Sequence, residues 1–189
     1  LTATWVFETG DCASTGVETV RVSWGPNGAA PDQAEFACTD GGGDLGEIAE
    51  GGGTYQITAE GLDGEGIARV ESFGQSATFG QGRTTGPLTI TLRPKSSDVI
   101  VSWNRCPSGV ILPYFIALYN PPAEVGGELT DKATESQEGC QAGSTTLMRV
   151  APGDYIVEVD SRAVTPALRA TAPVTVEPGV TAEVSVEFP

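Results

Sequence analysis

Short stretches in which apolar and polar residues alternate recur along the whole chain. Residues 88–94 read Leu-Thr-Ile-Thr-Leu-Arg-Pro, and residues 153–159 read Gly-Asp-Tyr-Ile-Val-Glu-Val. A period of two residues is typical of β-strands with one buried face, and no long segment shows the 3.6-residue period of an amphipathic helix. The 25 glycines and 13 prolines favour frequent turns between these stretches. The pattern predicts an all-β fold of antiparallel β-sandwiches.

The same order of features occurs in both halves of the chain, at a spacing of about 95 residues. Each half has an apolar strand with a tryptophan, two cysteines on either side of a second strand, a Gly-x-Tyr strand and a closing strand that ends in proline. The first half contains Trp5, Cys12, Cys38, Gly53, Tyr55 and Pro94, and the second contains Trp103, Cys106, Cys140, Gly153, Tyr155 and Pro189. The repeat predicts two tandem modules, residues 1–94 and 95–189.

The four cysteines allow three disulfide pairings. The repeat selects Cys12 with Cys38 and Cys106 with Cys140, because each module then contains one bond. The sequence has no C-x-x-C pair and no histidine to complete a usual zinc site. Disulfides form in oxidising compartments, so we expect an extracellular or cell-surface protein, with the periplasm as an alternative.

The last part of each module resembles the carboxypeptidase regulatory-like, or transthyretin-like, modules of bacterial surface proteins. The resemblance rests on residues 150–159, VAPGDYIVEV, and 174–184, VTVEPGVTAEV, which match a "PG-x-Y" strand followed by a "V-x-x-G-x-x" hairpin. In the first half it rests more loosely on Gly53 and Tyr55. It implies an Ig-like β-sandwich and a role in adhesion or scaffolding, and it implies no particular activity.

The negative charge of the chain and its lack of histidine argue against several classes of function. The formal net charge is −15, which would repel nucleic acid and anionic lipid. The longest apolar run, 110–119, has ten residues, against the roughly 20 needed to cross a bilayer, so we expect no membrane insertion. Without histidine, Ser-His-Asp and Cys-His arrangements cannot form, and only a pair of carboxylates remains as a catalytic alternative. We therefore expect a protein that is not an enzyme.

Two glycine-rich acidic loops are candidate calcium sites. The candidate ligands are Asp40, Asp44, Glu47, Asp63 and Glu65. Calcium binds six to eight oxygens, which flexible acidic loops can supply, but neither loop has the spacing of an EF-hand. Solvated turns are the simpler interpretation, because aspartate and glycine suit tight turns. No cofactor is predicted, and calcium is kept as an alternative.

The aromatic residues have a structural and a functional interpretation. Trp5, Trp24 and Trp103 could form a stacking platform for a sugar. Tryptophans on strands beside a disulfide more often fill a sandwich core, and we favour that interpretation. Tyr55 and Tyr155 follow turn glycines, and we expect them to pack inward with the hydroxyl group at the rim.

The second strands of the two modules differ. In residues 17–24 apolar and polar positions alternate, whereas in residues 110–119 both faces are apolar. A strand in an isolated sandwich needs only one apolar face. We therefore expect the face with Ile111, Phe115 and Tyr119 to meet another surface: the first module, a second copy or a ligand. The alternative is a bulge at Pro113 that turns the strand between faces.

These observations together predict a non-catalytic extracellular or cell-surface protein that acts in structure or adhesion through protein–protein contacts. A protein partner or self-association is expected. A subunit of a surface filament or pilus-like assembly is one alternative, because edge strands can recruit another chain. A carbohydrate-binding module is the other.

Overall fold

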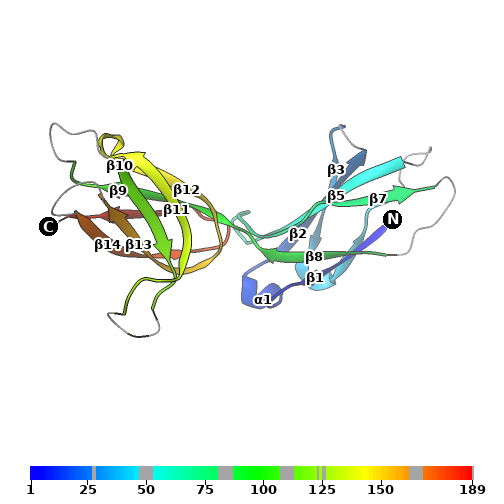
Figure 1. Ribbon diagram of the computed structural model, residues 1–189. Coiled ribbons are helices and arrows are strands. Elements are labelled where there is room, and N and C mark those ends of the chain that lie inside the picture. Colours follow the sequence, from blue (N-terminus) through cyan, green and yellow to red (C-terminus); the bar gives the residue numbers. More distant parts are fainter. Residues whose placement is uncertain are drawn as a thin grey trace. The chain divides into compact units, whose positions relative to one another are not determined.

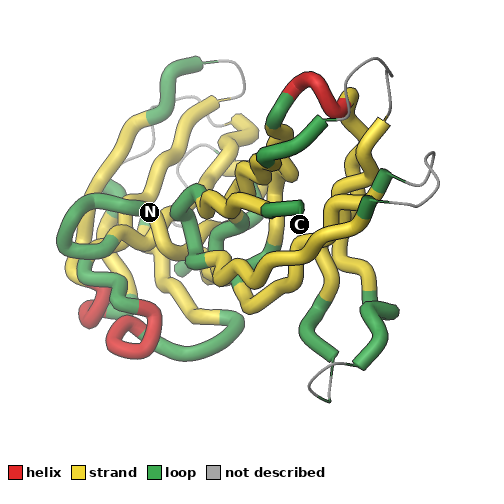
Figure 2. Tube along the Cα trace, turned by 90° about the vertical axis from the view of Figure 1, so that its left-hand side faces the viewer, coloured by secondary structure: helices red, strands yellow, loops and turns green. Residues whose placement is uncertain are grey.

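This computed structural model describes residues 1–26, 29–46, 53–80, 87–106, 113–122, 124, 127–161 and 168–188. The chain divides into two compact units, Leu1–Lys95 and Ser96–Pro189. Strands make up most of the described chain, and the helices are short segments, as the yellow and red parts of Figure 2 show. The prediction of an all-β fold is confirmed.

The first unit contains one hydrogen-bonded sheet with the order β3-β2-β5-β6-β8-β1-β4, and β7 pairs with β5 (Figure 1). β6 pairs with both β5 and β8, so it joins the two parts of the sheet. The strands are β1 (Thr2–Phe7), β2 (Thr19–Pro26), β3 (Asp32–Ala37), β4 (Gly42–Asp44), β5 (Gly53–Leu62), β6 (Ala68–Ser72), β7 (Gln75–Phe79) and β8 (Leu88–Pro94).

The second unit contains two sheets, one of four strands with the order β11-β10-β13-β14 and one of three strands with the order β12-β9-β15. Its strands are β9 (Ser97–Trp103), β10 (Pro113–Tyr119), β11 (Lys132–Gly139), β12 (Ser144–Val150), β13 (Gly153–Asp160), β14 (Arg169–Val176) and β15 (Ala182–Val186). The pairing repeats that of the first unit, because β10 lies between β11 and β13 as β2 lies between β3 and β5.

The sequence pattern predicts wholly antiparallel sheets, and this prediction is wrong for two strand pairs. β1 runs parallel to β8, and β9 runs parallel to β15. The first and last strands of each unit are therefore neighbours that run in the same direction. Alternating polarity reports which face of a strand is buried, but it carries no information on the direction of the neighbouring strand.

One described α-helix and two 3₁₀ helices accompany the strands: α1 (Cys12–Thr15), η1 (Cys38–Asp40) and η2 (Cys140–Ala142). η1 and η2 each end at a glycine with positive φ, 65° at Gly41 and 72° at Gly143. Glycine adopts this conformation without a steric penalty. The turn lets each glycine carbonyl accept the backbone N–H of the tryptophan in the opening strand, at 3.1 Å for Trp5 and 3.0 Å for Trp103.

Each unit has its own hydrophobic core. The inward positions of the alternating strands supply it, as the period of two predicts. The first core includes Trp5, Val20, Val22, Trp24, Ile57, Ile90 and Leu92. The second includes Val99, Val101, Trp103, Tyr114, Ile116, Leu118, Val157, Val159 and Val186.

The unit boundary falls between Lys95 and Ser96, one residue after the predicted boundary. Lys95 belongs to the first unit because its backbone N–H donates to the Arg69 carbonyl at 2.9 Å and its Nζ contacts Glu60 at 2.9 Å. The strand predicted at 110–119 is described from Pro113 onward, as β10.

Candidate functional site

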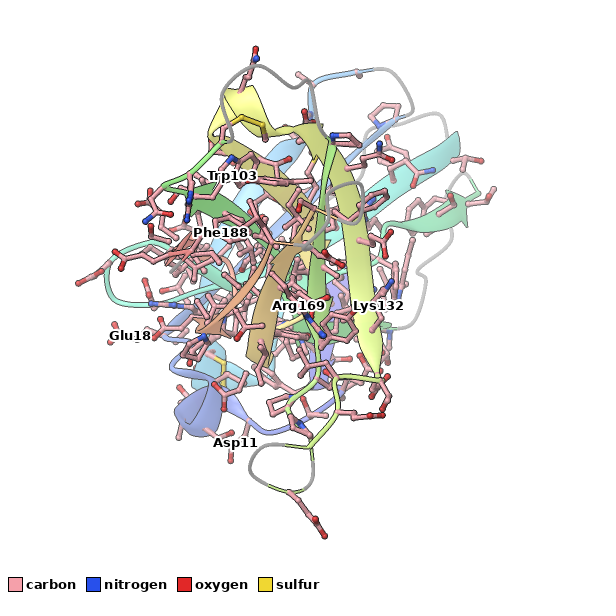
Figure 3. All side chains as sticks on the ribbon, turned by 60° about the vertical axis from the view of Figure 1, so that its left-hand side comes forward. Asp11, Glu18, Trp103, Lys132, Arg169 and Phe188 are labelled. Atoms are coloured by element: carbon pink, nitrogen blue, oxygen red, sulfur yellow. A yellow bond between two sulfur atoms is a disulfide. The ribbon has the colours of Figure 1, made fainter. Side chains whose placement is uncertain are left out.

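The disulfides lie beside the repeated tryptophans. Cys12 is bonded to Cys38 and Cys106 to Cys140, which are the pairs that the repeat selects. The indole Nε1–H of Trp5 donates to the Cys38 carbonyl at 3.0 Å, and that of Trp103 donates to the Cys140 carbonyl at 2.8 Å. Figure 3 shows Trp103 in the second unit, near the yellow disulfide bond. These residues bind the 3₁₀ turn to the opening strand, which is a structural role.

The three tryptophans are buried, with exposed fractions of 5% for Trp5, 8% for Trp24 and 7% for Trp103. The prediction that they fill the cores is confirmed, so they do not form a sugar platform. Tyr55 and Tyr155 are also buried, and the Tyr155 hydroxyl donates to the Ala151 carbonyl at 2.9 Å. Burial raises the pKa of Tyr155 above its ordinary value.

The Asp63 loop is organised by its own hydrogen bonds. Oδ1 of Asp63 accepts the backbone N–H groups of Glu65, at 2.9 Å, and Ile67, at 2.8 Å, and Oδ2 contacts Arg69 Nε at 2.8 Å. Burial raises the pKa of Asp63, but these hydrogen bonds to the charged form lower it by more, and its pKa lies below the ordinary value. The oxygens that calcium would need are therefore already used within the turn.

The other candidate calcium ligands that the structure describes do not gather into a site. Asp44 Oδ1 accepts the Gly46 N–H at 3.0 Å, and Asp40 ends the exposed turn η1. Glu47 lies outside the described residues. Among the residues that the structure describes, no group of three acidic or cysteine side chains is placed to hold a metal ion.

The two faces of β10 are both largely covered. Tyr114, Ile116 and Leu118 lie in the core of the second unit. On the opposite face Phe115 is half-buried, whereas Ala117 and Tyr119 are only 2% and 7% exposed. Ile111 lies outside the described residues. The predicted contact face is therefore not an open apolar patch at Tyr119, and its accessible part is at Phe115.

A bulge at Pro113 does not explain the two apolar faces. Pro113 is the first residue of β10 and pairs with Gly139, in register with the pairs that follow. The irregularity in this ladder lies at the other end, between Leu118 and Tyr119. The strand therefore presents two faces along its length, and it does not turn from one face to the other.

The outer face of the β11-β10-β13-β14 sheet contains a buried carboxylate that the sequence did not reveal. Glu158 on β13 is 4% exposed and lies opposite Ala117 on β10. It forms an ion pair with Arg169 on β14. Lys132 on β11 forms an ion pair with Glu135 and lies over the Tyr119 ring, 5.8 Å from its centroid. Figure 3 labels both cationic residues, Lys132 and Arg169.

The matching face of the first unit has a different chemistry. The register places Arg21, Ser23 and Gly25 where the second unit has Phe115, Ala117 and Tyr119. It likewise places Gln56 and Thr58 where the second unit has Ile156 and Glu158; both Gln56 and Thr58 are exposed. The outer face of the four-stranded sheet, which we call the β10 face, is thus the more apolar of two equivalent surfaces. Its outward residues are Pro113, Phe115, Ala117, Tyr119, Lys132, Glu135, Gln137, Asp154, Ile156, Glu158, Asp160, Arg169, Thr171, Pro173 and Thr175.

Among the described residues, no helix has the length and apolar character needed to span a membrane. No protein family and no curated protein matches the sequence.

Solved structures with a similar arrangement share little sequence with this chain. The TIE protein of Bacillus anthracis is 12% identical with a TM-score of 0.40; the match covers 99% of this chain and 33% of that one. A fimbrial assembly protein of Parabacteroides distasonis is 10% identical with a TM-score of 0.38, covering 98% and 90%. The major pilin of Streptococcus pyogenes is 12% identical with a TM-score of 0.26, covering 100% and 96%. This chain thus spans about a third of the length of the TIE protein.

Proposed function

We propose that this chain is a non-catalytic, extracellular or cell-surface protein that works in structure or adhesion through protein–protein contacts. In this proposal each unit is an Ig-like, transthyretin-like sandwich module, and the two modules stand in tandem. Its support is that each unit repeats the same strand pairing, the same tryptophan-to-cysteine hydrogen bond and its own disulfide. Two disulfides fit an oxidising compartment.

The observation that carries the proposal is the contrast between the two equivalent sheet faces. In the second unit the β10 face places half-buried Phe115 and Ile156 beside buried Glu158, which forms an ion pair with exposed Arg169. The first unit has arginine and glutamine at the two apolar positions. Half-buried apolar side chains on the two central strands, with Lys132 and Arg169 on the two edge strands, resemble a protein interface, whose centre is more apolar than its rim. The second unit therefore supplies the contact surface, and the first acts as a spacer.

A photo-crosslinking amino acid at position 115 tests this proposal. In the native cell envelope we expect a covalent protein adduct from Phe115 and none from the same crosslinker at Arg21, its counterpart in the first unit. Each position is the third residue of its strand, on an outer face and opposite an acidic residue, so the two differ in chemistry and not in placement. The absence of a protein adduct at position 115, or an equal yield from both positions, would contradict the proposed contact face.

A further inference from the structure

The edge strand β12 contains a strained residue. Arg149 has φ of 59° and is the only residue other than glycine with positive φ in the described part of the chain. It lies in a β-bulge, where the pairing of β12 with β9 shifts between Leu147 and Val150. The Asp98 carboxylate accepts the Arg149 backbone N–H at 3.0 Å and fixes the bulge. Strained backbone of this kind is concentrated at functional sites.

The bulge presents an apolar and a cationic side chain together. Met148 is 71% exposed, more than any other large apolar side chain in the described residues. Arg149 is exposed, and its side chain has no hydrogen bond or ion pair with another described residue. Six other described cationic side chains lie in ion pairs: Arg21, Arg69, Arg93, Lys95, Lys132 and Arg169. We call Met148 and Arg149 the β12 knob.

The register places Gly46 of the first unit where the second unit has Met148, and the counterpart of Arg149, Glu47, lies outside the described residues. In the first unit, β4 ends at Asp44 and is followed by buried Leu45 and by Gly46, whose φ is 79°. In the second unit the corresponding buried residue, Leu147, is followed by the knob. A glycine takes positive φ without strain, whereas in the second unit the positive φ falls one position later, on an arginine. The side chain of Arg149 thus stands at a position where the backbone favours glycine.

We propose that the β12 knob of one copy of this chain docks on the β10 face of a second copy. Met148 would contact half-buried Phe115 and Ile156. Arg149 would gain from the charge of the face, where four acidic residues outnumber two basic ones: Glu135, Asp154, Glu158 and Asp160 against Lys132 and Arg169.

The knob and the face are different surfaces, on β12 of the three-stranded sheet and on the outer side of the four-stranded sheet. A contact between two different surfaces leaves one of each unused in a dimer. Further copies can then add head to tail, and the assembly grows as a linear chain of subunits unless it closes into a ring.

This inference rests on the proposed function, because it names the partner of the β10 face. Sedimentation velocity of the full chain over a range of concentrations is the direct test. We expect species larger than dimers for the wild type. Arg149→Glu and Phe115→Ser should each weaken association by about tenfold or more, as expected for residues at the centre of a contact. Arg21→Ser, on the equivalent face of the first unit, should leave association unchanged.

A mixing experiment separates this contact from a symmetric one. Arg149→Glu keeps an intact β10 face, and Phe115→Ser keeps an intact knob. Each variant alone should stay monomeric, whereas an equimolar mixture should form one-to-one dimers and nothing larger. Arg149→Gly removes the cation while relieving the positive φ, so it should weaken association without loss of folding, as far-ultraviolet circular dichroism would show.

Three results would overturn the inference. They are a wild-type chain that stays monomeric at about 0.5 mM, knob variants that associate like the wild type, and a mixture that fails to dimerise. The proposed function is judged separately by the crosslinking at position 115. An adduct there with a different protein would keep the contact face and reject the second copy as its partner.

Discussion

At the scale of single residues, Glu158 shows how burial depends on neighbours that are remote in sequence. The alternation along β13 places Val157 and Val159 in the core and Glu158 on the outer side, where a strand in isolation would leave it exposed. It is buried because β13 lies between β10, which brings Ala117 opposite it, and β14, which brings Arg169. The sequence predicts the face of Glu158 but not its burial, since no local pattern specifies which strands are adjacent.

Arg169→Met should destabilise the second unit, because it leaves the Glu158 carboxylate buried without its cation. We expect a loss of about 1–3 kcal/mol, less than for a fully buried pair because the Arg169 side chain is 58% exposed. Guanidinium unfolding measures this loss. Arg21→Met is the control, since it removes the more exposed ion pair with Glu35 and should cost less than about 1 kcal/mol. Equal losses from both variants would contradict this account.

At the scale of elements, strand positions were more predictable than strand neighbours. The closing strand 88–94 was read directly from its alternation and is β8. The sequence did not predict that residues 68–79 form two strands, β6 and β7, separated at Phe73 and Gly74. This separation depends on partners that are remote in sequence, because β6 pairs with β8 while β7 pairs with β5. The acidic loops were recognised as turns or calcium sites. The structure shows that the Asp63 turn is held by its own backbone N–H groups, which sequence cannot distinguish from a metal loop.

Asp63→Asn should weaken the turn between β5 and β6 in a pH-dependent way. The folded-state pKa of Asp63 lies below its ordinary value of about 3.9, so its contribution to stability is present above that value and is lost as the pH falls through the folded pKa. The melting temperature of the variant should therefore be lower than that of the wild type at pH 7, and the difference should shrink below about pH 4.

The control for this experiment is Asp40→Asn, which removes an exposed acid from the other acidic loop. It should lower the melting temperature at pH 7 by less than Asp63→Asn does, because Asp40 lies exposed at the end of η1. A difference between Asp63→Asn and the wild type that stays constant from neutral to acidic pH would show that the carboxylate charge does not hold the turn.

At the scale of the whole molecule, the repeat was the most informative feature of the sequence. Tryptophans and cysteines recur at matching places because each unit needs the same hydrogen bond and the same covalent link between an early loop and its 3₁₀ turn. Their spacing indicated the cysteine pairs and a boundary within one residue of the structural one. The contact surfaces were harder to predict, since the β12 knob depends on a bulge and a positive φ that no sequence motif marks.

Removing one disulfide should affect one unit only. We expect Cys12→Ser combined with Cys38→Ser to lower the free energy of unfolding of the first unit by about 3.5 kcal/mol, because a loop of 26 residues is no longer closed in the unfolded chain. The second unit, with its own core and its own disulfide, should unfold as before. Scanning calorimetry resolves the two transitions. A parallel shift of both would show that the units are energetically coupled.

The parallel pairing of first and last strands has a consequence for a protein that carries load. β1 and β8 are joined by five register pairs, and so are β9 and β15. When tension pulls the two ends of a unit apart, it acts along these parallel strands and shears all the bonds of the ladder at once, because neither strand can peel away one bond at a time. Each unit should therefore resist stretching far better than its thermal stability suggests.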